Sequence, residues 1–155
     1  MTSTKIEDGL LSSFEWVEID KMLVEYNPKR YHLYASLFPS DKQGHIRDMA
    51  LSPMYEFIKE YSDCRREGRK FCDLETRYYK MQELYGREHP MIIAKMSNFI
   101  KLFEDILKNG VNDPPVVIAE EGGKFQIRDG HHRIACCMAV NQQRIVCRVI
   151  KGRIK

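Results

Sequence analysis

The sequence lacks the signatures of several large classes of protein. It contains no run of 18 apolar residues, and its N-terminal residues are polar, so we expect neither a membrane span nor a secretory signal. Its five cysteines are odd in number and form no Cys-x-x-Cys pair and no zinc-like spacing. Internal repeats and low-complexity tracts are also absent. These absences indicate a cytoplasmic protein with reduced thiols and no contact with a membrane.

The positive charge of the chain is concentrated at its C-terminal end. The 155 residues, 43% of them apolar, suit a single domain with one core, and the net charge is only +3. From Lys124 onward, however, the chain has eight lysines and arginines and a single carboxylate, Asp129. Such a basic end favours phosphate ligands or nucleic acid, and the alternative is a solvated edge strand and tail.

Residues 126–135 read as the end of a strand, a tight turn and the start of a helix. Phe125 and Ile127 alternate with polar residues, which is typical of a half-buried strand. After the turn at residues 129–130, apolar residues recur at helical spacing from Arg133 onward. The start of a helix presents unpaired backbone N–H groups, so this turn is a candidate anion site.

The side chains of the turn fit the same chemistry. Gly130 allows a positive φ and a close approach of a ligand to the backbone. Arg133 can bind a phosphate through two parallel hydrogen bonds. Asp129 can hold a divalent cation or accept a proton. Together these residues are suited to binding a nucleotide.

Residues 91–151 contain further motifs in a fixed order: a helix, a glycine, a proline-led strand, a hairpin, an Asp-Gly-x-His-Arg turn, a helix and a strand. The segments after the first helix are 115–118, 122–123, 125–127, 129–135 and 144–150. Motif and order are similar to the core of the ParB/sulfiredoxin superfamily. The resemblance implies an α+β fold with a small mixed sheet, packed helices and a cradle for nucleotide phosphates at the turn.

The superfamily includes sulfiredoxins, chromosome-partition CTPases and free-serine kinases that use ATP or ADP. Sulfiredoxins have a reactive cysteine where this chain has His131, so sulfinic-acid repair is not expected. Partition CTPases have a G-E-R-R-type turn followed by a helix-turn-helix domain, for which few residues remain here, so DNA partition is not expected either. The resemblance is therefore to the Asp-Gly-x-His-Arg branch, which includes the free-serine kinases.

The expected organisation is one ParB/sulfiredoxin-like domain over residues 1–155. Residues 1–13 are expected to be a loose lead-in, and residues 21–24 a short helical turn. The most regular element is a helix over 91–109, which keeps a 3.6-residue period throughout. The three parts of the domain are a first strand and loop (14–31), a helical insertion (32–90) and the core (91–151).

The insertion is expected to contain two helices. Ser52 and Pro53 make a good start for the first, and Asp73 can cap the second. The insertion either covers the nucleotide turn, shapes a pocket for a second substrate, or only thickens the core. The second helix would bury Leu74, Tyr78, Met81 and Leu84 or Tyr85. Cations that could contact an anion, or could simply be solvated, are Arg65, Arg66, Arg69, Lys70, Arg77 and Arg87.

The resemblance implies roles for the residues of the turn. Gly130, His131, His132 and Arg133 would bind the nucleotide phosphates, and His132 could also shuttle a proton. His131 stands at the variable position of the motif and would meet substrate or solvent. Asp129 would hold Mg²⁺ or accept a proton, and the alternative is that its carboxylate caps the new helix.

A catalytic base is expected near the first strand. In the serine-kinase branch a glutamate in this region deprotonates the acceptor, and Glu25 matches it by placement. Glu15 and Glu18 are rivals for that role, and the alternative is a surface glutamate without one.

Two functions are compatible with these residues. The first is a small-molecule kinase or nucleotide hydrolase that uses a nucleoside di- or triphosphate, Mg²⁺ and a small hydroxyl-bearing acceptor. The second is a non-catalytic module that binds a nucleotide or nucleic acid through the basic end.

Overall fold

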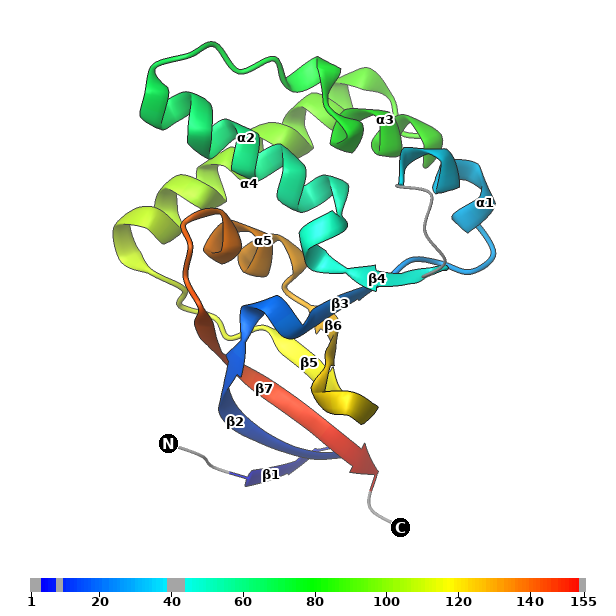
Figure 1. Cartoon of the computed structure of the whole chain (residues 1–155), viewed down its shortest axis with the longest axis vertical. Helices are drawn as coiled ribbons and strands as arrows, with labels where there is room; N and C mark the ends of the chain where they lie inside the picture. Colours follow the sequence, from blue (N-terminus) through cyan, green and yellow to red (C-terminus); the bar gives the residue numbers. More distant parts are fainter. Residues whose placement is uncertain (1–3, 8–9, 39–43, 154–155) are drawn as a thin grey trace.

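A computed structural model describes residues 4–7, 10–38 and 44–153 of the chain (Figure 1). Residues 1–3 and 8–9 of the expected lead-in, residues 39–43 of the insertion and residues 154–155 of the basic end lie outside these ranges. The strands are β1 (Thr4–Glu7), β2 (Leu10–Glu18), β3 (Met22–Glu25), β4 (Ile46–Asp48), β5 (Val116–Ala119), β6 (Phe125–Asp129) and β7 (Arg144–Arg153). The helices are α1 (Tyr31–Tyr34), α2 (Pro53–Glu67), α3 (Arg77–Leu84), α4 (His89–Asn109) and α5 (His131–Ala139).

The strands form one mixed sheet in the order β1-β2-β7-β5-β6-β3-β4. Two pairs are parallel, β5 with β7 and β3 with β6, and the other neighbours are antiparallel. The expected α+β class is therefore confirmed, as is the mixed sheet. Because β3 and β6 run in the same direction, their C-terminal ends lie at the same edge of the sheet, where the 129–133 turn begins.

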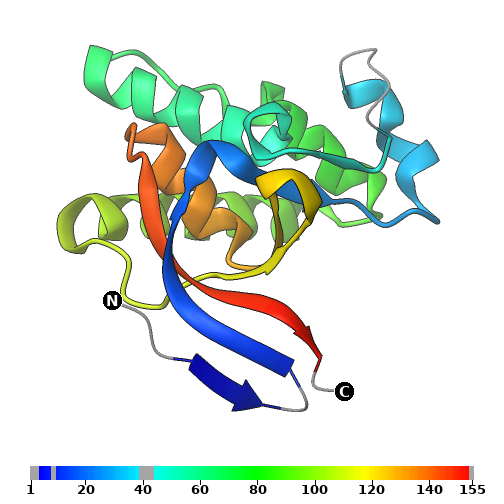
Figure 2. The same ribbon diagram turned by 60° about the horizontal axis from the view of Figure 1, so that its bottom comes forward.

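The helices gather on one side of the sheet, and the long β2–β7 pair extends away from them (Figures 1 and 2). Helix α5 lies between the sheet and the pair α2 and α4, and packs against both helices. It buries Ile134, Ala135, Cys136 and Cys137. Burial also raises the pKa of both thiols, that of Cys137 to about 11, so these cysteines are packing residues of the core.

The long helices follow the sequence patterns closely. The predicted helix over 91–109 is confirmed as α4, which starts two residues earlier and ends before Gly110. The predicted start of α2 is also confirmed, because the Ser52 hydroxyl accepts a hydrogen bond from the Tyr55 N–H at 3.1 Å with Pro53 in the first turn. No helix in the described ranges has both the length and the apolar character needed to cross a membrane.

Some local predictions were wrong. Residues 21–24 do not form a helical turn: a short turn ends at Lys21, and β3 follows because Met22 and Val24 alternate into the core. Residues 4–7 and 10–13 belong to β1 and β2 rather than to a loose lead-in. The insertion is not wholly helical, because it supplies the edge strand β4.

The second helix of the insertion was placed too early. Thr76, not Asp73, caps α3, and its hydroxyl accepts from the Tyr79 N–H at 3.2 Å. Tyr78 and Met81 are buried as predicted, but Leu74 precedes the helix and is half exposed.

Candidate functional site

The turn between β6 and α5 depends on Gly130. This residue has a φ of 95°, and a Cβ placed on it would lie 2.8 Å from the Cβ of Pro115 and 2.9 Å from Nη2 of Arg133. Any other residue would be strained and would collide with its neighbours. The glycine therefore lets α5 start immediately after the strand and keeps Arg133 folded against the turn.

Arg133 is held between two carboxylates. Its Nη1 lies 2.9 Å from Oδ2 of Asp113, and its Nη2 lies 3.1 Å from Oδ2 of Asp129. Nη1 also donates to the backbone oxygen of Asp113. The arginine side chain is only 16% exposed, whereas those of Asp113 and Asp129 are 85% and 69% exposed. A phosphate that binds Arg133 must therefore displace these carboxylates or share the guanidinium with them. Displacing solvated carboxylates is easier than displacing buried ones.

Asp113 was missed as a site residue in the sequence. Its place beside the turn follows from the pairing of β5 with β6 and from the backbone of residues 113–115 passing over Gly130. An aspartate shortly before a strand that pairs with the motif strand is the signal that could have found it.

The first backbone N–H groups of α5 have no side-chain cap. The N-cap residue is Gly130, and the Asp129 carboxylate accepts from Arg133 instead of capping the helix. Within the described ranges, no side chain accepts a hydrogen bond from the N–H groups of His131, His132 or Arg133. These donors are the usual partners of an anion at the start of a helix.

His132 is buried against the insertion and α4. Its ring meets Phe99 edge-on with a centroid distance of 4.5 Å, and a hydrogen bond of 3.1 Å joins its Nε2 to the Tyr78 hydroxyl. Burial lowers the pKa of His132 to about 4, with smaller contributions from the charges of Lys95 and His131. The imidazole is therefore neutral at pH 7. Its Nδ1 has no partner among the described residues and remains available for a ligand.

His131 is also neutral at physiological pH. Burial lowers its pKa below the usual value, and the nearby charge of Asp129 opposes this effect in part. The two adjacent imidazoles can therefore donate or accept hydrogen bonds, but they supply no positive charge. The charge for binding a phosphate has to come from arginine and lysine side chains.

Lys95 and Arg87 supply such charge on the helical side of His132. Lys95 is half-buried on α4, where burial and the charge of Arg87 both lower its pKa. Arg87 donates from Nη1 to Oε1 of the buried Gln82 and stacks over the ring of Tyr85 at 5.2 Å. Neither cation forms an ion pair with any residue in the described ranges.

Four other arginines of the insertion are neutralised by carboxylates. Arg65 pairs with Glu104 at 2.7 Å, Arg66 with Asp63 at 3.0 Å, and Arg69 with Glu67 at 2.5 Å. Arg77 pairs with Glu56 at 2.6 Å. Of the arginines that the sequence analysis named as possible anion contacts, Arg87 is the one without a carboxylate partner among the described residues.

Glu25 lies at the same edge of the sheet as the turn. Leu23 is level with Gln126 in the parallel pair, so Glu25 stands about one residue behind Asp129 on the neighbouring strand. Its carboxylate accepts a hydrogen bond from the Gln126 side chain. Strand alternation directs it to the sheet face opposite the helices, and it makes no hydrogen bond or ion pair with the described residues of the turn.

The two rivals of Glu25 lie farther from the turn. Glu15 binds Lys151 at 2.9 Å and Ser13 at 2.5 Å, which lowers its pKa. Glu18 pairs with Lys21 at 3.5 Å. Both are on β2, which is separated from β6 by β7 and β5. The topology therefore favours Glu25 over either rival.

The carboxylates at the turn fit a loosely held Mg²⁺ rather than a protein cage. No group of three or more His, Cys, Asp or Glu side chains in the described ranges could hold a metal ion. Asp113 and Asp129, however, converge on one guanidinium and are solvated. Mg²⁺ is commonly bound by one or two carboxylates together with water and substrate phosphates.

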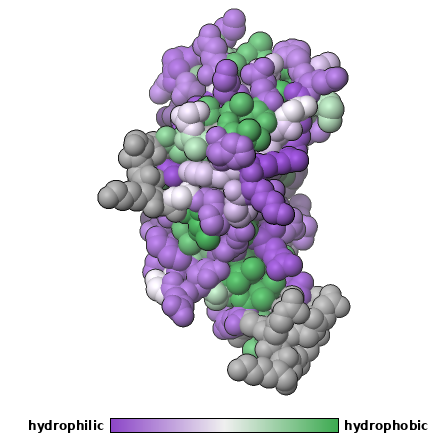
Figure 3. All heavy atoms as spheres, turned by 90° about the vertical axis from the view of Figure 1, so that its right-hand side faces the viewer, coloured by the Kyte–Doolittle hydropathy of each residue, from purple (hydrophilic) through white to green (hydrophobic). Residues whose placement is uncertain are grey.

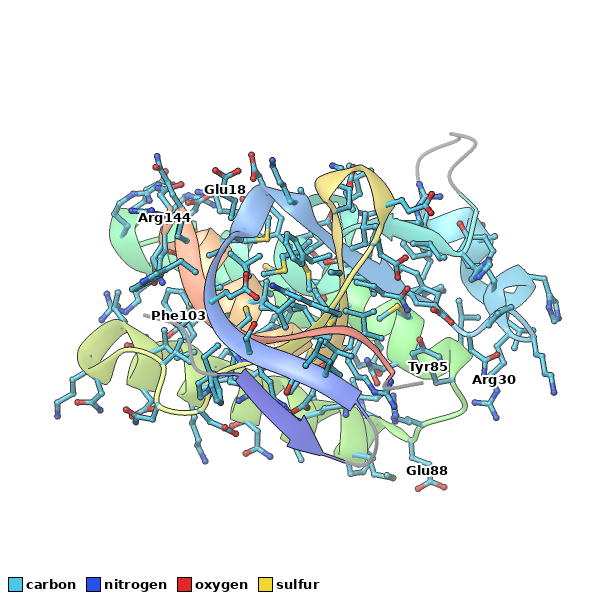
Figure 4. The ribbon with its side chains drawn as sticks, turned by 90° about the horizontal axis from the view of Figure 1, so that it is seen from below. Glu18, Arg30, Tyr85, Glu88, Phe103 and Arg144 are labelled. Atoms are coloured by element: carbon cyan, nitrogen blue, oxygen red, sulfur yellow. The ribbon has the colours of Figure 1, made fainter. Side chains whose placement is uncertain are left out.

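A separate hollow lies at the C-terminal end of α5, whereas the turn lies at its N-terminal end. It has a volume of about 740 Å³, and Glu18 and Arg144 are among its lining residues. Figure 4 shows these two side chains together at one end of the sheet and Tyr85 near the opposite end. Seen from the side of α1 and α3, the surface is mainly hydrophilic with small separate apolar patches (Figure 3). Because none of the residues that line the hollow belongs to the 129–133 turn, the hollow is distinct from the turn.

No match emerged from comparison with known proteins: no family model matches the sequence, and no curated protein or solved structure is significantly similar to it.

Proposed function

We propose that this protein binds the phosphates of a nucleoside di- or triphosphate at the start of α5 and transfers the terminal phosphoryl group to a small hydroxyl-bearing acceptor or to water. The observation that carries the proposal is the uncapped start of α5 beside Arg133. Backbone N–H groups and a guanidinium are both strong partners of phosphate oxygens. The resemblance of the surrounding motifs to the ParB/sulfiredoxin superfamily supports the same function and the same fold.

The reaction needs mainly positioning and neutralisation of charge. Arg133 and the N–H groups of residues 131–133 would hold the phosphates, and Nδ1 of His132 would add a neutral hydrogen bond. Asp113 and Asp129 would hold Mg²⁺, which supplies further positive charge to the phosphate oxygens when bound. Neutralising these two carboxylates would also free Arg133 to bind the ligand.

The acceptor would react at the strand edge. Its hydroxyl oxygen would attack the terminal phosphorus, the bond from that phosphorus to the bridging oxygen would break, and the nucleotide would leave one phosphate shorter. The hydroxyl proton would pass to a carboxylate, for which Glu25 and Asp129 are the candidates. Turnover that survives in both Glu25→Gln and Asp129→Asn, measured on folded protein, would exclude these carboxylates as the base.

Binding can be tested by calorimetric titration of ADP, ATP, CTP and GTP, with and without Mg²⁺. We expect one nucleotide to bind the wild type about 10-fold or more tightly than Arg133→Gln, because a charge-assisted contact is lost. Arg128→Gln is the matched control, since Arg128 is an exposed arginine of the same strand-turn segment. Absence of nucleotide binding to the wild type at millimolar concentration would contradict the proposal.

A second candidate function is binding of single-stranded nucleic acid on the open face of the sheet. Trp16, the single tryptophan of the chain, is 57% exposed on β2, and the Arg144 guanidinium lies 5.9 Å from its ring centroid. Aromatic and arginine side chains on a sheet surface can stack on bases. Quenching of Trp16 fluorescence by an oligonucleotide, weakening steeply as salt rises, would favour this candidate over the nucleotide site.

A further inference from the structure

The most unusual electrostatic feature of the helical layer is the pair formed by Arg87 and Lys95. Both side chains are half-buried, and each lacks a carboxylate partner among the described residues. Removing an unpaired cation from water is unfavourable, and two neighbouring cations repel each other. An anion bound between them would offset both costs.

Lys95 is placed toward the start of α5 by its helix. It lies four residues before Phe99, and side chains at this spacing share one face of a helix. His132 packs edge-on against Phe99, so Lys95 stands one helical turn from the ring that His132 contacts. Its charge is close enough to act on His132. The lysine therefore lies on the face of α4 that packs against His132.

Arg87 is already fixed in position. Its guanidinium is bonded to the buried amide of Gln82 and stacked on Tyr85. Glu88, the adjacent acid in sequence, projects away from the body of the protein and does not neutralise it (Figure 4). A planar guanidinium held on two sides loses little freedom when it binds an anion.

We propose that Arg87 and Lys95 bind the terminal phosphate of a nucleoside di- or triphosphate whose inner phosphates lie at the start of α5. This inference rests on the proposed function and assigns the ligand class, a polyphosphate, because it uses cations of the insertion and of α4 in addition to Arg133 at the turn. It also gives the insertion a role, because Arg87 follows α3 and Tyr78 of α3 positions His132.

The test is calorimetric titration of AMP, ADP and ATP into the wild type and into Lys95→Met and Arg87→Met. We expect either substitution to weaken ATP binding about 10- to 100-fold, as the loss of a charged hydrogen bond predicts, and to change AMP binding much less. Lys101→Met is the matched control, because Lys101 is an exposed lysine on the same helix. It should leave all three affinities unchanged.

The outcomes separate this inference from the proposed function. If ATP binds the wild type and the Lys95 and Arg87 variants equally, the terminal-phosphate site is overturned while nucleotide binding stands. An equal loss in Lys101→Met would show a general effect of charge and overturn the site as well. If no nucleotide binds the wild type, both proposals fail.

The stability of the ligand-free variants gives an independent readout. Because Lys95 is a half-buried cation without a partner, Lys95→Met should unfold at the same or a higher urea concentration than the wild type. A lysine that only supports the fold would give the opposite shift, which would contradict a binding role.

Discussion

Two groups of basic side chains on the helical layer differ in how their charge is balanced. At the C-terminal end of α2, Arg65, Arg66 and Arg69 each lie within 3.0 Å of a carboxylate. Beside the start of α5, Arg87 and Lys95 have no acidic partner in the described ranges, and the imidazole between them and the turn is neutral. Both groups are basic, but the side chains of the second group are less exposed to solvent.

The difference shows which cations are available to a ligand. A surface arginine with its own carboxylate is largely satisfied, and an incoming anion would have to compete for it. A cation that is partly removed from water without a partner carries a desolvation cost that no interaction offsets. A bound anion can supply that interaction. The sequence placed Arg87 in one set with the arginines of α2 and did not single out Lys95, because charge and spacing do not reveal the partners.

The largest expected effect on stability comes from lowering the pH, because His132 is buried near the charge of Lys95 and resists protonation in the folded protein. The His132 pKa is about 4 in the folded protein and 6.5 in the unfolded chain, so between these values the unfolded chain takes up a proton that the folded protein does not. Stability present above pH 6.5 is therefore lost as the pH falls toward 4, by up to about 3 kcal/mol. Urea unfolding at pH 7.5 and 4.5 measures this loss.

The control for this experiment is His132→Gln, whose amide can still bond to Tyr78 but does not titrate. The difference in free energy of unfolding between wild type and variant should become smaller as the pH falls. The reason is that only the wild type carries the imidazole whose protonation favours the unfolded chain. A difference that stays constant would mean that the pKa of His132 is the same in the folded protein as in the unfolded chain. The ring would then not be affected by the unpaired charges, and the comparison with α2 would break down.

The next effect concerns the turn that places α5 beside Arg87 and Lys95. Gly130→Ala should lower the free energy of unfolding by about 2 kcal/mol or more, because a left-handed φ and a collision with Pro115 act together. Gly122→Ala is the matched control: its φ is 80°, but a Cβ there would meet nothing within 4 Å, so it should lose only about 1 kcal/mol. Urea unfolding of both variants measures the difference, and equal losses would show that the close approach at Gly130 is unimportant.

The sequence predicted the parts of the fold that depend on local patterns. Helix α4 was found because its apolar period continues over 21 residues, and the β6–α5 turn because strand, glycine and helix are adjacent in the chain. Strand β3 was missed because it has only four residues and is held by pairing with β6, about 100 residues later.

The same reason explains what was missed at the site. The bond between Tyr78 and His132 joins residues 54 positions apart, and the contact of Asp113 with Arg133 spans 20. A motif indicates which residues carry the chemistry. It does not indicate which of them already have partners, and that is what separates Arg87 from Arg65 or Arg77.

The smallest expected effect is that of Arg65→Met in the paired group. Tyr61 also donates to Glu104 at 2.6 Å, so the carboxylate would keep a partner when the arginine is removed. Because exposed ion pairs contribute little to stability, the urea midpoint should remain nearly unchanged, and nucleotide affinity should stay within a factor of about two. A loss of ATP affinity as large as that expected for Lys95→Met would show that long-range charge, rather than an unpaired local site, governs binding. The distinction between the two basic groups would then have no functional meaning.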